Sequence, residues 1–273
     1  MPRTDGRMPD AQKRSNKPSP RYCRILLRSG LALPAFLLLL WWWGSRSGWW
    51  SPYILPSPSV VMNSFVSMAM DGSLLRNAAA SILRIVKGFS VSLAAAVSIA
   101  FACGAYAPLM RQLSPTLEFL RHIPPMATIP MLILWFGIGE TSKIVIIVLA
   151  AFFPIFLNTA KGIEESDAGL VEVASLFGYD RFQVLWYVAA PSALPYILTG
   201  MRLGLGYSWR SLIAAELLAA SSGLGYLILD AEQLARPDAI MVGILVIGAL
   251  GSAMDVFLSK LAGRLVRYSD ISV

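Results

Sequence analysis

Residues 163–195 read I-E-E-S-D-A-G-L-V-E-V-A-S-L-F-G-Y-D-R-F-Q-V-L-W-Y-V-A-A-P-S-A-L-P and lie between two long apolar runs. Five acidic side chains interrupt a sequence that otherwise avoids charge: Glu164, Glu165, Asp167, Glu172 and Asp180. A charged segment between apolar runs of this length predicts a polar loop that joins two membrane spans.

The spacing of apolar residues predicts two short helices in this loop. Two sets fall at i, i+3, i+4 and i+7, the spacing that places one apolar stripe on a helix. The sets are Leu170, Val173, Ala174 and Phe177, then Phe182, Leu185, Trp186 and Ala189. Asp167 stands where an N-cap belongs and Gly178 where a left-handed helix stop belongs. We expect Pro191 and Pro195 to end the second helix.

On pattern alone, the loop is either an amphipathic surface segment lying against the membrane or a docking element for another protein. The residues of its sequence motif favour the docking element. E-V-A-S-L-F-G at residues 172–178, followed by L-P at 194–195, resembles the E-A-A-x-x-x-G signature (EAA motif) of membrane subunits of binding-protein-dependent ABC importers. The glutamate, the second alanine and the glycine match, and Val173 replaces the usual first alanine.

The resemblance implies that this loop forms a cytoplasmic coupling helix, which in that family seats in a groove on the ATPase subunit. The ATPase-coupling residues that it implies are Glu172, Ala174, Phe177, Gly178, Tyr179 and Asp180.

Composition supports an integral membrane protein. The 273 residues are 56% hydrophobic and 14% charged, whereas globular domains carry about 25% charged residues. A net charge of +7 would suggest nucleic acid in a soluble protein, but in a membrane chain basic residues mark cytoplasmic ends, next to membrane lipid. Cys23 and Cys103 are isolated thiols and imply neither a disulfide framework nor a metal site.

The chain divides into a basic tail, residues 1–28, and a transmembrane permease domain, residues 29–273, that includes the loop 163–195. The tail is expected to be disordered and cytoplasmic. A secretory signal peptide is the alternative, but W-W-W followed by G-S-R-S-G-W-W offers no small-residue cleavage site. Five tryptophans there indicate an aromatic belt at the outer interface, so residues 31–43 form a first span running outward.

About six spans are expected, with both termini cytoplasmic because Lys260, Arg264 and Arg267 follow the last one. The spans after the first are residues 77–106, 126–138, 144–157, broken by Pro154, 196–220 and 239–261. A short amphipathic helix at residues 58–70 and a half-polar helix between the last two spans lie on the outer side. Residues 108–125 are expected to be a short connection, in which His122 is structural.

The chain lacks the motifs of catalysis. It contains no G-x-x-x-x-G-K-[ST], no G-x-S-x-G and no H-E-x-x-H, so any ATPase must be another chain, and we expect no enzymatic activity and no cofactor.

Arg210 and Glu216 in the fifth span are candidates for the translocation pathway, with Arg210 attracting an anion. The alternative is that both stabilise helix packing, because charges in a bilayer normally face protein or a wet cavity. They lie about 120° apart on the helix, so each needs a partner elsewhere.

Two further stretches resemble one branch of these importers. I-P-P-M-A-T-I-P-M-L-I-L-W-F-G-I-G-E at residues 123–140 is similar to a segment in permeases for nitrate, sulfonate and taurine, although His122 stands where proline is expected. S-L-I-A-A-E followed by G-L-G is similar to the family's fifth-span segment.

The resemblance implies an all-α, polytopic membrane helical bundle with the type I ABC importer permease fold, in a bacterial cytoplasmic (inner) membrane. It implies a homodimer with ABC ATPase subunits inside and a periplasmic or extracellular substrate-binding protein outside. A small anionic solute such as an aliphatic sulfonate, taurine or nitrate would cross by alternating access. The rival is a secondary transporter or a membrane scaffold without an ATPase.

Overall fold

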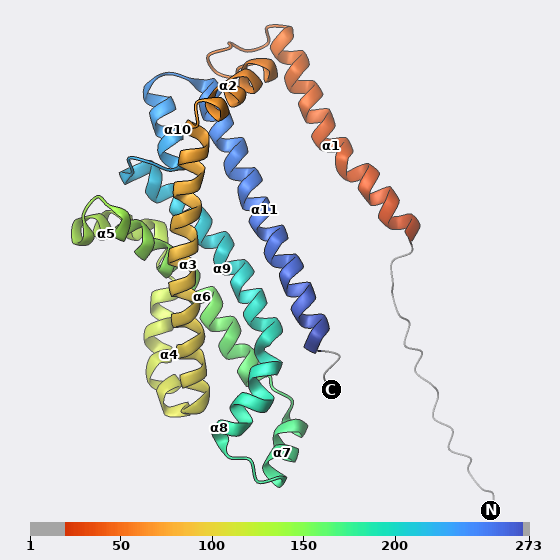
Figure 1. Ribbon diagram of the computed structural model, residues 1–273, viewed down its shortest axis with the longest axis vertical. Helices are drawn as coiled ribbons and strands as arrows, with labels where there is room; N and C mark the ends of the chain where they lie inside the picture. Colours follow the sequence, from red (N-terminus) through yellow and green to blue (C-terminus); the bar gives the residue numbers. More distant parts are fainter. Residues whose placement is uncertain (1–19, 270–273) are drawn as a thin grey trace, which may run out of the picture. The chain divides into compact units, whose positions relative to one another are not determined.

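The computed structural model describes residues 20–269, with side chains from 33 to 265, and these residues are predominantly helical (Figure 1). Two compact units divide between Pro58 and Ser59. In the first unit, the chain turns after α1 (Pro20–Arg46), and Trp41 Nε1 of α1 donates to Pro56 O beyond the turn at 3.0 Å. Residues 1–19 of the predicted tail lie outside the described residues, and residues 20–28 belong to α1.

The second unit contains the remaining helices, and residue 269 is the last of its residues that the structure describes. In chain order they are α2 (Pro58–Met70), α3 (Ser73–Ala105), α4 (Ala107–Arg121), η1 (Pro125–Thr128), α5 (Ile129–Phe136), α6 (Glu140–Glu164), α7 (Ala168–Leu176), α8 (Arg181–Val184), η2 (Leu185–Ala189), α9 (Ala190–Ala219), α10 (Leu224–Gln233) and α11 (Pro237–Ser269). The predicted helix at residues 58–70 is confirmed as α2.

Four helices in the described residues are long and apolar enough to cross a membrane, or five if one bent pair counts as a span. The four are Ser73–Ala105, Glu140–Glu164, Arg181–Ala219 and Pro237–Leu265. They confirm the all-α membrane bundle and four of the expected spans. The expected first span at residues 31–43 lies on α1, whose side chains are described only from Leu33 onwards.

The short connection expected at residues 108–125 is wrong, and the third expected span is not a single straight helix. Residues 108–125 are mostly α4, and the apolar run 126–138 is η1 followed by α5, bent by 83° from α4. Pro124 and Pro125 prevent the helix from continuing, because neither can donate a backbone hydrogen bond. The eight residues of α5 extend only about 12 Å, far less than a bilayer.

The predicted proline breaks are also wrong. Pro154 lies inside α6 and Pro195 inside α9, and both helices continue. Membrane helices tolerate proline because neighbouring groups and local adjustments satisfy the freed backbone groups. Near Pro191 the adjustment is a π turn, η2, which joins α8 directly to α9.

The core of the second unit lies where α6 packs between α3 and α9. Ala96 and Ala100 of α3 are buried with Ala151 and Ile155 of α6. On α9, glycine permits the closest approach: a Cβ on Gly200 would stand 2.9 Å from Pro154 O and 3.0 Å from Ile155 Cα. Small residues at such contacts let membrane helices pack backbone to backbone.

This packing predicts opposite effects for two glycines on α9. Gly200→Ala should destabilise the folded chain by about 1 to 3 kcal/mol, because the new methyl group meets backbone atoms that cannot move aside. Gly206→Ala has no atom within 4 Å of the new Cβ and should be neutral or stabilising by about 0.5 to 1 kcal/mol. Thermal unfolding of the two variants in one detergent measures the difference; equal midpoints would contradict the close contact.

Candidate functional site

The loop at residues 163–195 folds through local capping. The side chain of Asp167 accepts a hydrogen bond from Gly169 N at 2.8 Å and caps α7. At the other end, Gly178 adopts φ +82°, and Tyr179 N donates to Ala174 O at 3.1 Å. The predicted N-cap and left-handed stop are confirmed, since Asp accepts from orphan N–H groups and glycine enters the left-handed region without strain.

A capping box begins the next helix. Asp180 Oδ1 accepts from Gln183 N at 2.7 Å, while Gln183 Oε1 accepts from Asp180 N at 2.9 Å. These reciprocal bonds satisfy two donors at the start of α8. With the left-handed Gly178 before it, Asp180 therefore fixes the angle between α7 and α8.

The tip formed by α7 and the following turn exposes apolar side chains. Leu176 is 81% exposed and Phe177 79%, and Ala174 is the buried residue of α7. The predicted stripe thus faces outward at most of its positions, beside the exposed carboxylate of Glu172. Figure 1 shows α7 and α8 at one end of the second unit, with α2 and α10 at the other. A rigid, outward apolar tip suits a docking element.

A hydrogen bond ties the base of this loop to the membrane helices. The Tyr196 hydroxyl of α9 donates to Glu165 Oε2, just after α6, and Lys161 Nζ lies 3.5 Å from the same carboxylate. Chiefly through the tyrosine, this arrangement lowers the pKa of the Glu165 carboxyl. The loop therefore begins from a fixed point between two spans.

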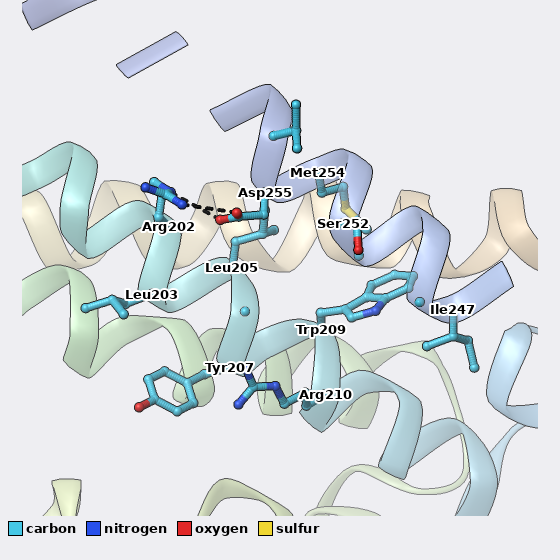
Figure 2. A pocket seen from close by; sticks show the side chains of 14 residues that line it. Arg202, Leu203, Leu205, Tyr207, Trp209, Arg210, Ile247, Ser252, Met254 and Asp255 are labelled. Atoms are coloured by element: carbon cyan, nitrogen blue, oxygen red, sulfur yellow. Dashed lines mark hydrogen bonds and ion pairs between the residues drawn. The ribbon is translucent and has the colours of Figure 1, made fainter. Parts of the chain in front are cut away.

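A cavity of about 620 Å³ lies between α9 and α11, and Arg210 lines it (Figure 2). The Arg210 side chain is exposed, its Cζ lies 5.8 Å from the ring centre of Tyr207, and no carboxylate among the described residues pairs with it. The other arginine on the wall, Arg202, forms a two-pronged pair with Asp255 at 3.1 and 3.0 Å. Figure 2 shows Arg210 and Tyr207 pointing away from that pair.

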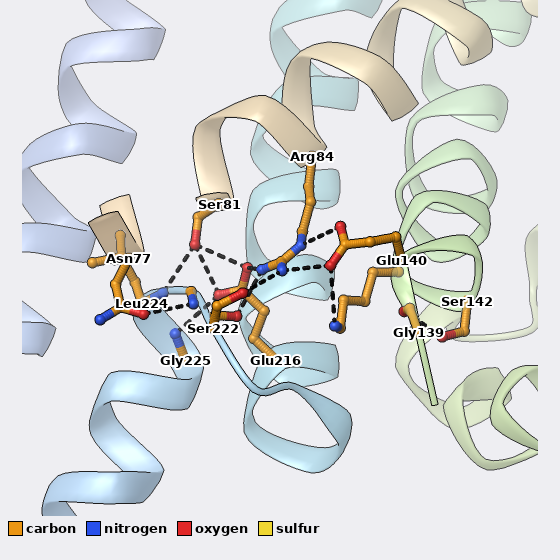
Figure 3. Close-up of polar contacts among 12 residues, drawn as sticks. Asn77, Ser81, Arg84, Gly139, Glu140, Ser142, Glu216, Ser222, Leu224 and Gly225 are labelled. Atoms are coloured by element: carbon orange, nitrogen blue, oxygen red, sulfur yellow. Dashed lines mark hydrogen bonds and ion pairs between the residues drawn. The ribbon is translucent and has the colours of Figure 1, made fainter. Parts of the chain in front are cut away.

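Glu216 is fully buried, with 0% of its surface exposed, in a polar cluster near the C-terminal end of α9 (Figure 3). Its carboxylate accepts from Arg84 Nη1 at 2.7 Å, from Ser81 Oγ at 2.9 Å and from Gly225 N at 3.0 Å. Gly225 belongs to the first turn of α10, so the carboxylate also sits at a helix N-terminus, where negative charge is stabilised. A Cβ on Gly223 would overlap the Glu216 carboxylate, which explains why a glycine occupies this position.

Arg84, 4% exposed, is the centre of the cluster and was not among the predicted site residues. Its Nε and Nη2 donate to Glu140 at 2.8 and 2.6 Å, Nη1 to Glu216, and Nη1 and Nη2 to the backbone and hydroxyl of Ser222 at 2.8 Å. All five guanidinium N–H groups are used. Lys143 Nζ lies 3.6 Å from Glu140, so two positive and two negative groups meet.

The geometry therefore separates the two pathway candidates. Arg210 faces a cavity with its charge unpaired by the described carboxylates, whereas Glu216 is enclosed and fully paired, which favours the packing interpretation for Glu216. The pairing of Arg84 was hidden because Glu216 lies 132 residues away in sequence. Among described residues, no three histidine, cysteine or acidic side chains gather as metal ligands would.

Comparison with known proteins decides the family. The family described as "Binding-protein-dependent transport system inner membrane component" matches residues 90–267. The chain belongs to this family. The match includes the loop 163–195, Arg210 and Glu216, and its members are permease components of ABC importers.

Three similar proteins place this permease more closely. It is 35% identical, over 97% of its length and 96% of the relative, to a Bacillus subtilis (strain 168) permease, SsuC, provisionally named for aliphatic sulfonates. It is 37% identical to the taurine transport system permease protein TauC of Escherichia coli (strain K12), with 80% and 84% covered. It is 33% identical to the bicarbonate transport system permease protein CmpB of Synechococcus elongatus, with 72% of each chain covered.

The fold matches a solved structure titled as an amino acid ABC transporter with histidines. The TM-score is 0.60 at 16% identity, and the match covers 75% of this permease and 98% of that chain. The expected type I importer permease fold, in the nitrate, sulfonate and taurine branch, is therefore confirmed.

Proposed function

We propose that this permease subunit is driven by a separate ATPase that docks on the tip formed by residues 168–180. The observation that carries the proposal is the combination, in a family member, of the E-V-A-S-L-F-G motif with a rigidly capped and outward-facing apolar tip. Closure of the ATPase pulls on this tip, and the helices that leave it convert the movement into alternating access. The chain itself performs no covalent chemistry.

The solute is a small anion, and Arg210 attracts it. The names of similar permeases refer to aliphatic sulfonates, taurine and bicarbonate, and we include nitrate on the motif at residues 123–140. Arg210 supports this assignment because its charge, in the middle of a span, faces a cavity without a carboxylate partner among the described residues. Glu216 is assigned to packing rather than to solute contact.

A second copy of this chain encloses the pathway. The side of α9 that carries Arg210 and Tyr207 is exposed in the single chain, and a charge facing lipid at mid-bilayer would cost about 2.5 to 3.5 kcal/mol or more. A homodimer removes that cost by placing these side chains against protein or water. The permease dimer lies in a bacterial inner membrane, with both termini of each chain in the cytoplasm. The substrate-binding protein docks on its outer side.

Co-purification tests the docking proposal. The chain, purified from the membranes of its own cells, should retain an ATPase at roughly one copy per permease, and Leu176→Asp with Phe177→Asp should release it. Because both side chains are exposed, the variant should fold like the wild type. Met70→Asp, comparably exposed at the end of α2 and outside the candidate spans, is the control and should keep the ATPase. An ATPase retained by the tip variant would exclude this docking site.

Arg210→Met should impair anion uptake by about tenfold while leaving the complex assembled, because a loss of about 1.4 kcal/mol in binding the anion is tenfold. Uptake of radiolabelled taurine, ethanesulfonate, bicarbonate and nitrate into cells provides the measurement. Arg210→Lys, which keeps the charge, should retain more activity, and Lys87→Met, an exposed cation on α3, should have no effect. Wild-type uptake of every anion by Arg210→Met would assign Arg210 to packing.

A further inference from the structure

The π turn η2 (Leu185–Ala189) stands between the docking tip and the membrane part of α9. In it, Ala190 N donates to Leu185 O, five residues back instead of four. Pro191 explains the widening, because it has no N–H and its ring would clash with the carbonyl of Tyr187 in an α-helix. A π turn accommodates one extra residue, and such turns occur mostly at functional positions and at helix bends.

The chain is rigid on both sides of this turn. On the membrane side, a Cβ on Gly162 of α6 would stand 2.9 Å from Ala193 Cα, and Gly200 is equally close to α6. On the tip side, the left-handed Gly178 and the Asp180 capping box fix α7 against α8. Any change of angle between the tip and α9 must therefore be concentrated in η2.

Aromatic contacts hold the turn without locking it. Trp186 stacks on Phe101 of α3, with ring centres 5.4 Å apart and planes 8° apart, and Phe182 of α8 meets Trp186 edge-on at 6.1 Å. Tyr187 lies 5.9 Å from Tyr179 in the tip turn. Offset stacked rings keep their attraction over a range of displacements, so Trp186 can slide on Phe101 as the angle changes.

There is also room for the tip to move. A cavity of about 440 Å³ separates the inner side of α7 and α8 from the ends of α3 and α6. Val171, Ser175 and Tyr179 line it from the tip, and Gly104 and Ile163 from the membrane helices. Close-packed interiors transmit strain directly, whereas a gap of this size lets the tip approach the spans before contact stops it.

We propose that η2 is the joint through which motion of the docked ATPase reaches α9, with Pro191 and Trp186 as its positioning residues. This inference rests on the proposed docking function and adds where the movement occurs. The tip rotates as one body, the π turn changes its bend, Trp186 slides across Phe101, and α9 moves with α6 as a second body.

Spin-label distances in the permease–ATPase complex test the joint. Cysteines replace Ala168 in the tip, Thr199 in α9 and Leu218 further along α9, all exposed positions, after Cys23 and Cys103 are changed to serine. Each labelled chain is diluted with unlabelled chain so that only distances within one chain are read. Between nucleotide-free and ATP–vanadate-trapped complexes, the 168–199 distance should shift by ~2 Å or more, the size of helix shifts in switching proteins. The 199–218 distance should stay constant.

A straightened variant tests whether the π turn is required. Deleting Val188 together with Pro191→Ala removes the extra residue and the proline, which leaves a plain α-helix with both flanks at their original rotation. The variant should bind the ATPase but show no shift in the 168–199 distance. Pro195→Ala is the control: it removes a proline within α9 but lies outside the π turn, and should shift like the wild type.

The outcomes distinguish the joint from the docking proposal. If the wild-type chain does not bind the ATPase, the docking function itself is overturned. A bound and vanadate-trapped ATPase with an unchanged 168–199 distance would overturn the joint alone, as would a full shift in the straightened variant. If the straightened variant fails to assemble, the wild-type comparison of the two distances still decides.

Discussion

Replacing Arg84 with leucine is expected to destabilise the folded permease by about 3 to 5 kcal/mol, the usual effect of breaking a buried ion pair from one side. The substitution leaves Glu216 fully buried with its charge uncompensated. It also leaves the Ser222 carbonyl, which accepts from Arg84 Nη1 in the wild type, without that donor. Because folded domains are stable by about 5 to 15 kcal/mol, this loss should be visible as a lower yield and an earlier thermal transition in detergent.

Two variants separate this cause from the loss of an arginine as such. Lys87→Leu removes a cation from an exposed position on the same helix and should leave the transition unchanged. Adding Glu216→Met to Arg84→Leu removes the orphaned charge and should recover part of the stability, because apolar replacement of a whole buried pair is often neutral. A double variant as unstable as the single one would show that the ion pair is not the main contribution of Arg84.

Gly178→Val is expected to abolish uptake while the chain still inserts into the membrane. The backbone there has φ +82°, where an ordinary residue costs about 1 to 2 kcal/mol and a β-branched one more, so the turn must reshape and change the angle between α7 and α8. No atom lies within 4 Å of the new Cβ, so the effect comes from the backbone and not from crowding. Uptake and ATP hydrolysis by the same membranes measure the coupling.

A matched glycine controls for backbone strain. Gly72 has φ +74°, and no atom lies within 4 Å of a Cβ added there, so Gly72→Val imposes the same strain before α3, away from the tip. It should keep uptake close to wild type. Gly178→Asn should also retain more uptake than Gly178→Val, since asparagine tolerates the left-handed region. Equal losses at Gly72 and Gly178 would remove the evidence for a special role of the loop.

Local chemistry made the two short helices of the loop at residues 163–195 predictable. The N-cap at Asp167 and the stop at Gly178 depend on residues within one turn of chain, so their pattern sufficed to place them. The prolines misled for the opposite reason. Whether Pro191 and Pro195 end a helix depends on what surrounds the freed backbone groups, and a membrane helix absorbs them by local widening rather than by stopping.

Contacts between distant segments could not be read from the sequence. Arg84 was visible as a charge near the start of a span, but its partners lie 56 and 132 residues further on, and no spacing rule connects them. The bend between α4 and α5 was missed similarly, because an apolar run of moderate length fits a short span or a re-entrant segment equally well. Glu216 was correctly expected to need a partner outside its own helix.

The order in which the cluster's members are synthesised has a consequence for biogenesis. Arg84 emerges from the ribosome 132 residues before Glu216, an interval of roughly 7 to 26 s at about 5 to 20 residues per second. Glu140, the other carboxylate partner, follows Arg84 by only 56 residues, so insertion must accommodate an isolated cation in a nascent span until Glu140 is synthesised. A truncated product that ends before α9 keeps the pair of Arg84 with Glu140 but lacks Glu216, so the cations of Arg84 and Lys143 share a single carboxylate in the incomplete cluster.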